Sequence, residues 1–141
     1  MKVNRVIICA DGASRGNPGP AAIGATIKDE QGKLIARISQ RIGWATNNQA
    51  EYRAIITALE EATKLGAKQV DISSDSQLVV RQIGGEYRVK KVALKPLYQQ
   101  VKKLQSLLDG FTITYIPRQQ NQEADNLANM ALRYRLPTSP P

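Results

Sequence analysis

The chain has 141 residues, of which 42% are hydrophobic, and this is typical of one domain with a buried core. Its 20 Lys and Arg residues against 12 Asp and Glu residues give a formal net charge of +8, which favours nucleic acid over a membrane surface as the partner. The absence of histidine excludes imidazole bases, His-dependent serine triads and Cys/His zinc sites, and a single cysteine excludes an intrachain disulfide.

The first part of the chain predicts three sequential antiparallel strands. We expect them at residues 3–10, 21–28 and 33–42. The first is nearly all apolar from Val6 onward, as in a central strand covered on both faces, with Cys9 as a small core residue. Gly and Pro residues at 16–20 predict a turn, and residues 29–32 have the chemistry of a hairpin.

A long helix and a parallel strand are predicted next. Thr46 and Gln49 have the spacing of a capping box, and the apolar stripe that follows ends at Gly66, a favourable residue after a helix C-terminus. Glu51 is in phase with that stripe, so its carboxylate is expected to point toward the core near the helix head. Residues 69–74 alternate as a fourth strand, parallel to the first if the helix crosses over right-handedly.

The second half of the chain predicts three more helices and a fifth strand. In order, we expect a helix over 77–83, a helix opening at Pro96, a strand over 111–116 and a helix over 121–133. The second of these helices is expected to turn inward Leu97, Val101, Leu104, Leu107 and Leu108. Residues 87–95 form a basic connector, and Asp125 lies in phase with Ala128 and Leu132, which predicts that it faces inward.

This order of elements predicts an α/β fold: a mixed five-stranded sheet, with three antiparallel strands plus two parallel ones, flanked by helices. We expect one domain over residues 1–136 and a flexible Pro-rich tail at 137–141. No stretch approaches the roughly 20 apolar residues of a transmembrane helix, and the apolar run at residues 6–10 is too short for a signal peptide. We therefore expect a cytoplasmic monomer without membrane contact.

Four acidic residues stand among small or amide residues at the predicted ends of elements. They are Asp11, Glu51, Asp75 and Asp125. Hard oxygen ligands of this kind select magnesium or manganese, and the carboxyl ends of parallel strands are where open α/β sheets bind ligands. The structural alternatives are a turn at Asp11, a helix cap at Asp75, and charges that complement a helix dipole at Glu51 and Asp125. If the fold brings the four together, they form a two-metal phosphoryl-transfer site.

Six short motifs follow one another along the chain: DGAS at 11–14, GNPGP at 16–20, TNNQAE at 46–51, SDSQ at 74–77, VRQI at 80–83 and NQEADNLA at 121–128. Together they resemble the type 1 ribonuclease H family over about residues 3–133. The resemblance implies a ribonuclease H-like fold and a metal-dependent endonuclease that hydrolyses the RNA strand of RNA/DNA hybrids to 5′-phosphate and 3′-hydroxyl products. It matches the four acidic residues to the family's metal ligands, which would hold two Mg²⁺ ions, with Mn²⁺ as a substitute.

The same resemblance assigns contacts with the hybrid. It matches minor-groove contacts to Ser14, Asn17, Asn47, Asn48 and Gln77, a DNA-phosphate contact to Thr46, and a sugar-packing aromatic to Tyr87. Short neutral amides suit the groove, since they donate and accept hydrogen bonds without adding charge near the metals. Turn and cap roles for the asparagines, and packing for Trp44 and Tyr87, are the alternatives.

Three departures from the family pattern concern specificity. A loop histidine that assists turnover in well-studied bacterial members is absent, and the short loop 117–120 carries Arg118 instead. Our hypothesis is that Arg118 contacts phosphate or assists product release, since it stabilises charge but relays no protons near neutral pH. Trp44-Ala45 replaces an arginine of the family, and the basic protrusion is shortened to residues 87–95. A looser grip on the DNA strand is therefore expected.

Two other function classes stay open. One is a non-catalytic nucleic-acid-binding module of the same fold, and the other is a nuclease that also acts on double-stranded RNA or serves a reverse transcriptase. The presence of all four acidic residues favours the enzyme over the binding module. No obligate protein partner is expected.

Overall fold

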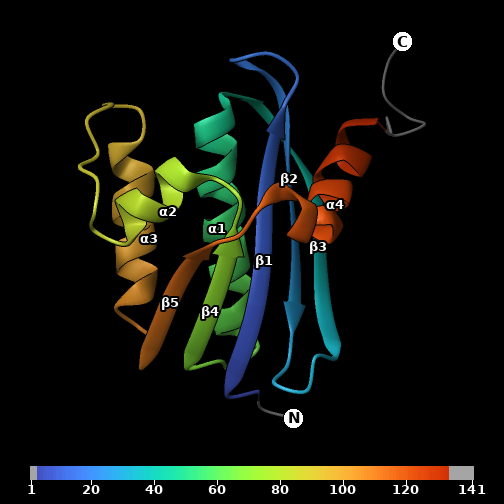
Figure 1. Ribbon diagram of the computed structural model, residues 1–141, viewed down its shortest axis with the longest axis vertical. Coiled ribbons are helices and arrows are strands. Elements are labelled where there is room, and N and C mark those ends of the chain that lie inside the picture. The colour runs from blue at the N-terminus through green and yellow to red at the C-terminus, as the bar shows by residue number, and fades with distance from the viewer. Residues whose placement is uncertain (1–2, 134–141) are drawn as a thin grey trace.

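The computed structural model describes residues 3–133 (Figure 1). In chain order the elements are β1 (Arg5–Ser14), β2 (Gly19–Lys28), β3 (Leu34–Ala45), α1 (Asn47–Lys64), β4 (Gln69–Ser74), α2 (Gln77–Ile83), α3 (Lys95–Gln105), β5 (Gly110–Tyr115), the 3₁₀ helix η1 (Arg118–Gln120) and α4 (Gln122–Arg133). The predicted tail at 137–141 lies outside the described residues. Within 3–133, none of the helices is long and apolar enough to span a membrane.

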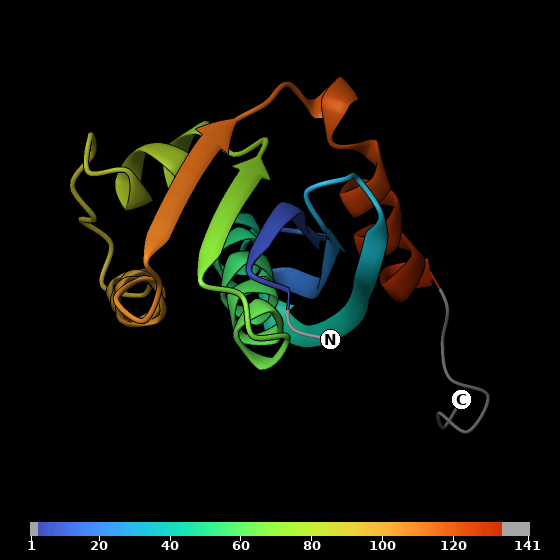
Figure 2. The ribbon, with the colours of Figure 1, turned by 90° about the horizontal axis from the view of Figure 1, so that it is seen from below.

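The five strands form one mixed sheet in the order β3-β2-β1-β4-β5. The β1–β2 and β2–β3 pairs are antiparallel, and the β1–β4 and β4–β5 pairs are parallel. Helices α1 and α3 lie on one face of the sheet and α4 lies on the other (Figure 2). This arrangement confirms the predicted fold class, including the parallel course of β1 and β4.

Local signals explain how α1 begins and what it buries. The Thr46 hydroxyl accepts a hydrogen bond from Gln49 N, and Gln49 Oε1 accepts one from Thr46 N, so the predicted capping box is present. The apolar stripe of α1 is fully buried against the sheet, where Val6 and Ile8 of β1 are also fully buried. Gly66 follows the helix with a φ of 88°, in the left-handed region that glycine adopts without strain.

Strand β1 is longer than predicted, and this changes the position of Asp11. Its parallel pairing with β4 ends at Ala10 opposite Ser74, but its antiparallel pairing with β2 continues to Ser14 opposite Ala21. Asp11 therefore lies inside a strand and not at its end. It follows the last residue that β1 pairs with β4, so it still stands at the carboxyl edge of the parallel half of the sheet.

Strand pairing and packing also account for other differences between the predicted and the observed elements. Strand β2 already begins at Gly19, and β3 continues to Ala45, because the two strands pair along that whole length. Trp44 is consequently displayed on β3 with 71% of its surface exposed, so the packing interpretation of this residue is wrong. Helix α3 ends at Gln105, which leaves Leu107 exposed beyond it and not inward as predicted. Cys9 is half-buried and does not belong to the core.

Candidate metal centre

An acidic cluster forms where the carboxyl ends of β1 and β4 meet the head of α1. Asp11 comes from β1, Glu51 from the second turn of α1, and Asp75 directly follows β4. One carboxylate oxygen from each of the three lies within 4.8 Å of the other two. Asp125 of α4 lines the same cleft from the opposite face of the sheet. The fold thus brings together residues that are up to 114 positions apart in the sequence.

Two glycines allow the helices to come close enough to the sheet. A Cβ atom on Gly12 would lie 2.3 Å from the carbonyl carbon of Ala50, so only glycine lets β1 approach the head of α1. A Cβ atom on Gly24 would lie 2.2 Å from the Ala124 carbonyl oxygen, which places α4 equally close to β2. Gly24 pairs with Asp11 across β1 and β2. Both helices that carry acidic residues therefore rest directly on strand backbone.

The carboxyl groups of the cluster oppose one another's ionisation. Burial, followed by the negative charges of Glu51 and Asp75, raises the pKa of Asp11 to about 10. Burial also raises the pKa of Glu51 to about 7, although the Gly12 amide donates a hydrogen bond to Glu51 Oε1 and acts in the opposite direction. The fully ionised cluster is therefore unfavourable without a compensating positive charge.

The donor set fits a hard divalent cation. Its close-lying donors are carboxylate oxygens, with neither imidazole nor thiolate, and magnesium and manganese prefer such ligands. Three convergent donors and the raised pKa of Asp11 indicate that bound cations would relieve the repulsion.

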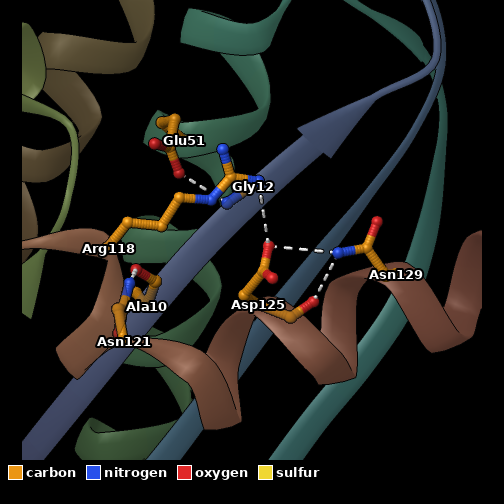
Figure 3. Close-up of polar contacts among 7 residues, drawn as sticks. All are labelled: Ala10, Gly12, Glu51, Arg118, Asn121, Asp125 and Asn129. Carbon is orange, nitrogen blue, oxygen red and sulfur yellow. Dashed lines mark hydrogen bonds and ion pairs between the residues drawn. The ribbon is translucent and has the colours of Figure 1, made fainter.

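Two further residues surround Asp125, as Figure 3 shows. Asn129, one helical turn later, donates from Nδ2 to Asp125 Oδ1 at 3.0 Å and to the Asp125 carbonyl oxygen at 2.9 Å. The Arg118 guanidinium lies 3.8 Å from Asp125 Oδ1 while 79% of its side chain stays exposed. Sequence reasoning predicted a role for Arg118 but missed Asn129, whose i+4 spacing from Asp125 was the available signal.

The cluster lies in a cleft of about 440 Å³. Of the residues matched to hybrid contacts, Ser14, Asn47 and Asn48 line it, and Ser76 and Tyr115 line it although the sequence did not single them out. Small polar groups therefore stand beside the acidic cluster.

The remaining predicted contacts lie around the cleft and not in its lining. Asn17 Oδ1 accepts a hydrogen bond from Asn47 N at 3.1 Å, and the Thr46 hydroxyl is engaged in the helix cap. Gln77 is exposed at the start of α2. Tyr87 lines an adjacent groove of about 530 Å³ with basic residues of the 87–95 connector, and Arg81 lies over its ring at 5.3 Å from the centroid. Asn48 lines both the groove and the cleft, which are therefore contiguous.

Comparison with known proteins agrees with this fold and cluster. A family model described as "Reverse transcriptase-like" matches residues 9–131. The chain belongs to this family. Within it, the likeness to type 1 ribonucleases H is confirmed, because Ribonuclease HI of Halobacterium salinarum is 44% identical over 128 residues, which are 91% of this chain and 64% of that protein.

Solved structures agree with the sequence relatives. A crystal structure of RNase H1 from Halobacterium salinarum superposes with a TM-score of 0.90 at 43% identity, covering 92% of this chain and 98% of that one. LC11-RNase H1, isolated from compost by a metagenomic approach, was solved in complex with an RNA/DNA hybrid; it superposes with a TM-score of 0.87 at 41% identity, covering 91% of this chain and 96% of that one.

Some relatives are much longer than this chain. The bifunctional protein Rv2228c of Mycobacterium tuberculosis is 45% identical over 129 residues, which are 91% of this chain but only 35% of that protein.

Proposed function

We propose that the chain is a divalent-metal-dependent endoribonuclease that cuts the RNA strand of RNA/DNA hybrids and leaves 5′-phosphate and 3′-hydroxyl ends. The observation that carries the proposal is the convergence of carboxylate oxygens from Asp11, Glu51 and Asp75 within 4.8 Å, in a cleft of a protein with a net charge of +8. The 44% identical Ribonuclease HI and the 41% identical chain solved with a hybrid support the same reaction and substrate.

In this proposal Asp11, Glu51, Asp75 and Asp125 hold two magnesium ions, which manganese can replace. When bound, such ions would supply activation of the attacking water and positive charge for the departing 3′ oxygen. The protein's part is to fix the ligands. The Gly12 amide orients Glu51, and Asn129 orients the Asp125 carboxylate.

Arg118 completes the proposed site as an exposed cation at its rim. Its guanidinium is mostly exposed, so it is free to leave Asp125 for a phosphate of the substrate or product. A guanidinium stays protonated in proteins, so Arg118 stabilises charge and transfers no proton.

Recognition of the hybrid is assigned to the neutral residues of the cleft and its surroundings. Ser14, Asn47 and Asn48, which line the cleft, contact the hybrid from the minor groove, where amides and hydroxyls can bind 2′-hydroxyl groups. Asn17 and Gln77 extend this surface along the minor groove, Thr46 contacts a DNA phosphate, and Tyr87 packs against DNA sugars beside the basic connector.

A panel of end-labelled RNA/DNA, RNA/RNA and DNA/DNA duplexes, incubated with magnesium and separately with manganese, tests the proposal. We expect cleavage of the RNA strand of the hybrid, and Asp75→Asn should bind that hybrid without cutting it. A wild-type protein that is folded, binds metal and hybrid, and never cuts would instead be the non-catalytic binding module. Cleavage of RNA/RNA would show that the short connector has relaxed the substrate choice. Monomeric state and cytoplasmic location stay predictions.

A further inference from the structure

Asn121 forms hydrogen bonds with the chain segment that carries Asp11 and with the segment that carries Asp125. It lies between η1 and α4 and is 1% exposed. Its Nδ2 donates a hydrogen bond of 3.0 Å to the carbonyl oxygen of Ala10, the residue before Asp11 (Figure 3). Its own main-chain carbonyl accepts a hydrogen bond of 3.1 Å from Asp125 N. One buried residue thus spans the gap between β1 and α4.

The hydrogen bond to Ala10 lies at the position where the pairing of β1 with β4 ends. The last pair between β1 and β4 is Ala10 with Ser74, so beyond it β1 pairs within the sheet with β2 alone. Asp11 is the first residue past that point. The Asn121 amide therefore fixes the strand where parallel pairing no longer does.

Packing alone does not account for an amide at this position. Among the described residues, Asn121 Oδ1 is a buried side-chain atom without a hydrogen-bond partner. Leaving a buried carbonyl oxygen unpaired lowers stability, and an apolar side chain of similar size would avoid that cost. The hydrogen bond from Nδ2 to the Ala10 carbonyl oxygen is what distinguishes asparagine from such a residue.

We propose that Asn121 is a positioning residue that sets the separation of Asp11 and Asp125 for metal binding. This inference rests on the proposed function of the acidic cluster. Asn121 touches neither metal nor substrate. It acts by holding the backbone on either side of the cleft at a fixed distance, in the way that groups behind metal ligands orient them.

The test compares Asn121→Ser with a control at the other end of the same helix. Serine is a favourable residue before a helix but is too short to keep the bond to the Ala10 carbonyl. The control is Arg41→Met, because Arg41 donates to the carbonyl oxygens of Ala131 and Leu132 at 2.9 and 2.8 Å and so attaches the far end of α4 to β3. Both variants loosen α4, but only one changes the span from Asp11 to Asp125.

Magnesium affinity, measured by titration calorimetry on the full chain, is the main readout. We expect Asn121→Ser to bind magnesium about 10- to 100-fold more weakly, and Arg41→Met to stay within about twofold of wild type. In cleavage assays Asn121→Ser should need more magnesium for half-maximal rate yet recover most of the rate at saturation. Asn121→Ala provides a second variant, and thermal scans without metal rank the stability of all three.

Two results would overturn the inference. One is wild-type magnesium affinity in both Asn121 variants. The other is an equal loss of magnesium affinity in Arg41→Met at equal metal-free stability, since loosened attachment of α4 would then account for the loss in the Asn121 variants as well. A wild-type protein that binds no magnesium would instead refute the proposed function, so the two failures are distinguishable.

Discussion

The main-chain amide of Gly12 donates a hydrogen bond to the Glu51 carboxylate, which joins β1 to the head of α1 beside the acidic cluster. This contact exists only because a Gly12 side chain is missing: a Cβ atom there would lie 2.3 Å from Ala50 and 2.4 Å from Glu51 N. Because these atoms belong to the backbone, they cannot move aside to accommodate the added Cβ atom. The position of Glu51 thus depends on the smallest residue of the facing strand.

Gly12→Ala should therefore damage both the fold and the metal site. Overpacking of this kind costs about 1–3 kcal/mol or more of unfolding free energy, and the displaced helix head should carry Glu51 away from Asp11. Urea unfolding and magnesium titration measure the two effects. Gly110→Ala is the matched control, because its Cβ would meet only the flexible Gln69 side chain at 3.4 Å. Normal stability and affinity in Gly12→Ala would contradict the expected close approach.

Magnesium should stabilise the protein, because a bound cation offsets the mutual repulsion of the carboxylates. At a free concentration 100 times the dissociation constant, the gain is about 2.7 kcal/mol of unfolding free energy. Thermal scans with and without magnesium measure it.

Asp11→Asn separates repulsion from metal binding. The buried Asp11 carboxyl has a pKa raised to about 10, so a neutral amide there should raise the melting temperature of the metal-free protein. The same variant should lose most of the magnesium-dependent shift and its cleavage activity. A metal-free melting temperature that falls in Asp11→Asn would show that the cluster is not under strain.

Arg118→Ala should slow turnover more than it weakens hybrid binding. The exposed guanidinium lies at the rim of the acidic cleft, so we expect a loss of roughly tenfold, below the 10²–10³-fold cost of removing a preorganised donor. Single-turnover and steady-state rates tell chemistry from product release. Arg118→Lys should recover part of the loss, since it keeps the charge but not the planar fork. Unchanged turnover in Arg118→Ala would contradict the proposed role of Arg118 in phosphate contact or product release.

The ion pair that ties β4 to β1 should make stability depend on pH. A hydrogen bond from Thr112 and the Arg5 guanidinium hold the pKa of Asp71 below its ordinary value of 3.8. Because the folded-state pKa is the lower one, this stabilisation is complete above pH 3.8 and is lost as the pH falls through the folded pKa.

Asp71→Asn should accordingly cost about 0.2–1 kcal/mol of unfolding free energy at neutral pH, the range of partly exposed ion pairs. The difference from wild type should shrink as the pH falls below 3.8. Urea unfolding over a pH series measures it, with the exposed Asp109→Asn as control. A difference that grows in acid would reverse the assigned direction of the pKa shift.

The parts of the fold that could be predicted are those specified by neighbours in sequence. The capping box of Thr46 and Gln49, the strand at 69–74 and the helix at 77–83 all follow from residues a few positions apart, and the structure has them where they were expected. Acidic residues flanked by small and amide residues also stand out locally, which is why the cluster could be proposed.

What could not be predicted depends on residues distant in sequence. The extension of β1 through Asp11 requires knowing that β2 pairs with it up to Ser14, and the exposure of Trp44 requires knowing how far β3 runs beside β2. The Asn121 bond to Ala10 joins residues 111 positions apart, and no spacing rule signals it. Pairing partners, and not propensities, decide these features.

Because α4 is the final described element and lies across the sheet from α1, the acidic cluster is complete only when both layers have docked. During translation, a ribosome-bound chain that has exposed Asp11, Glu51 and Asp75 still lacks Asp125. Under the proposed function, a nascent polypeptide would thus lack the complete metal site until α4 had emerged and folded back.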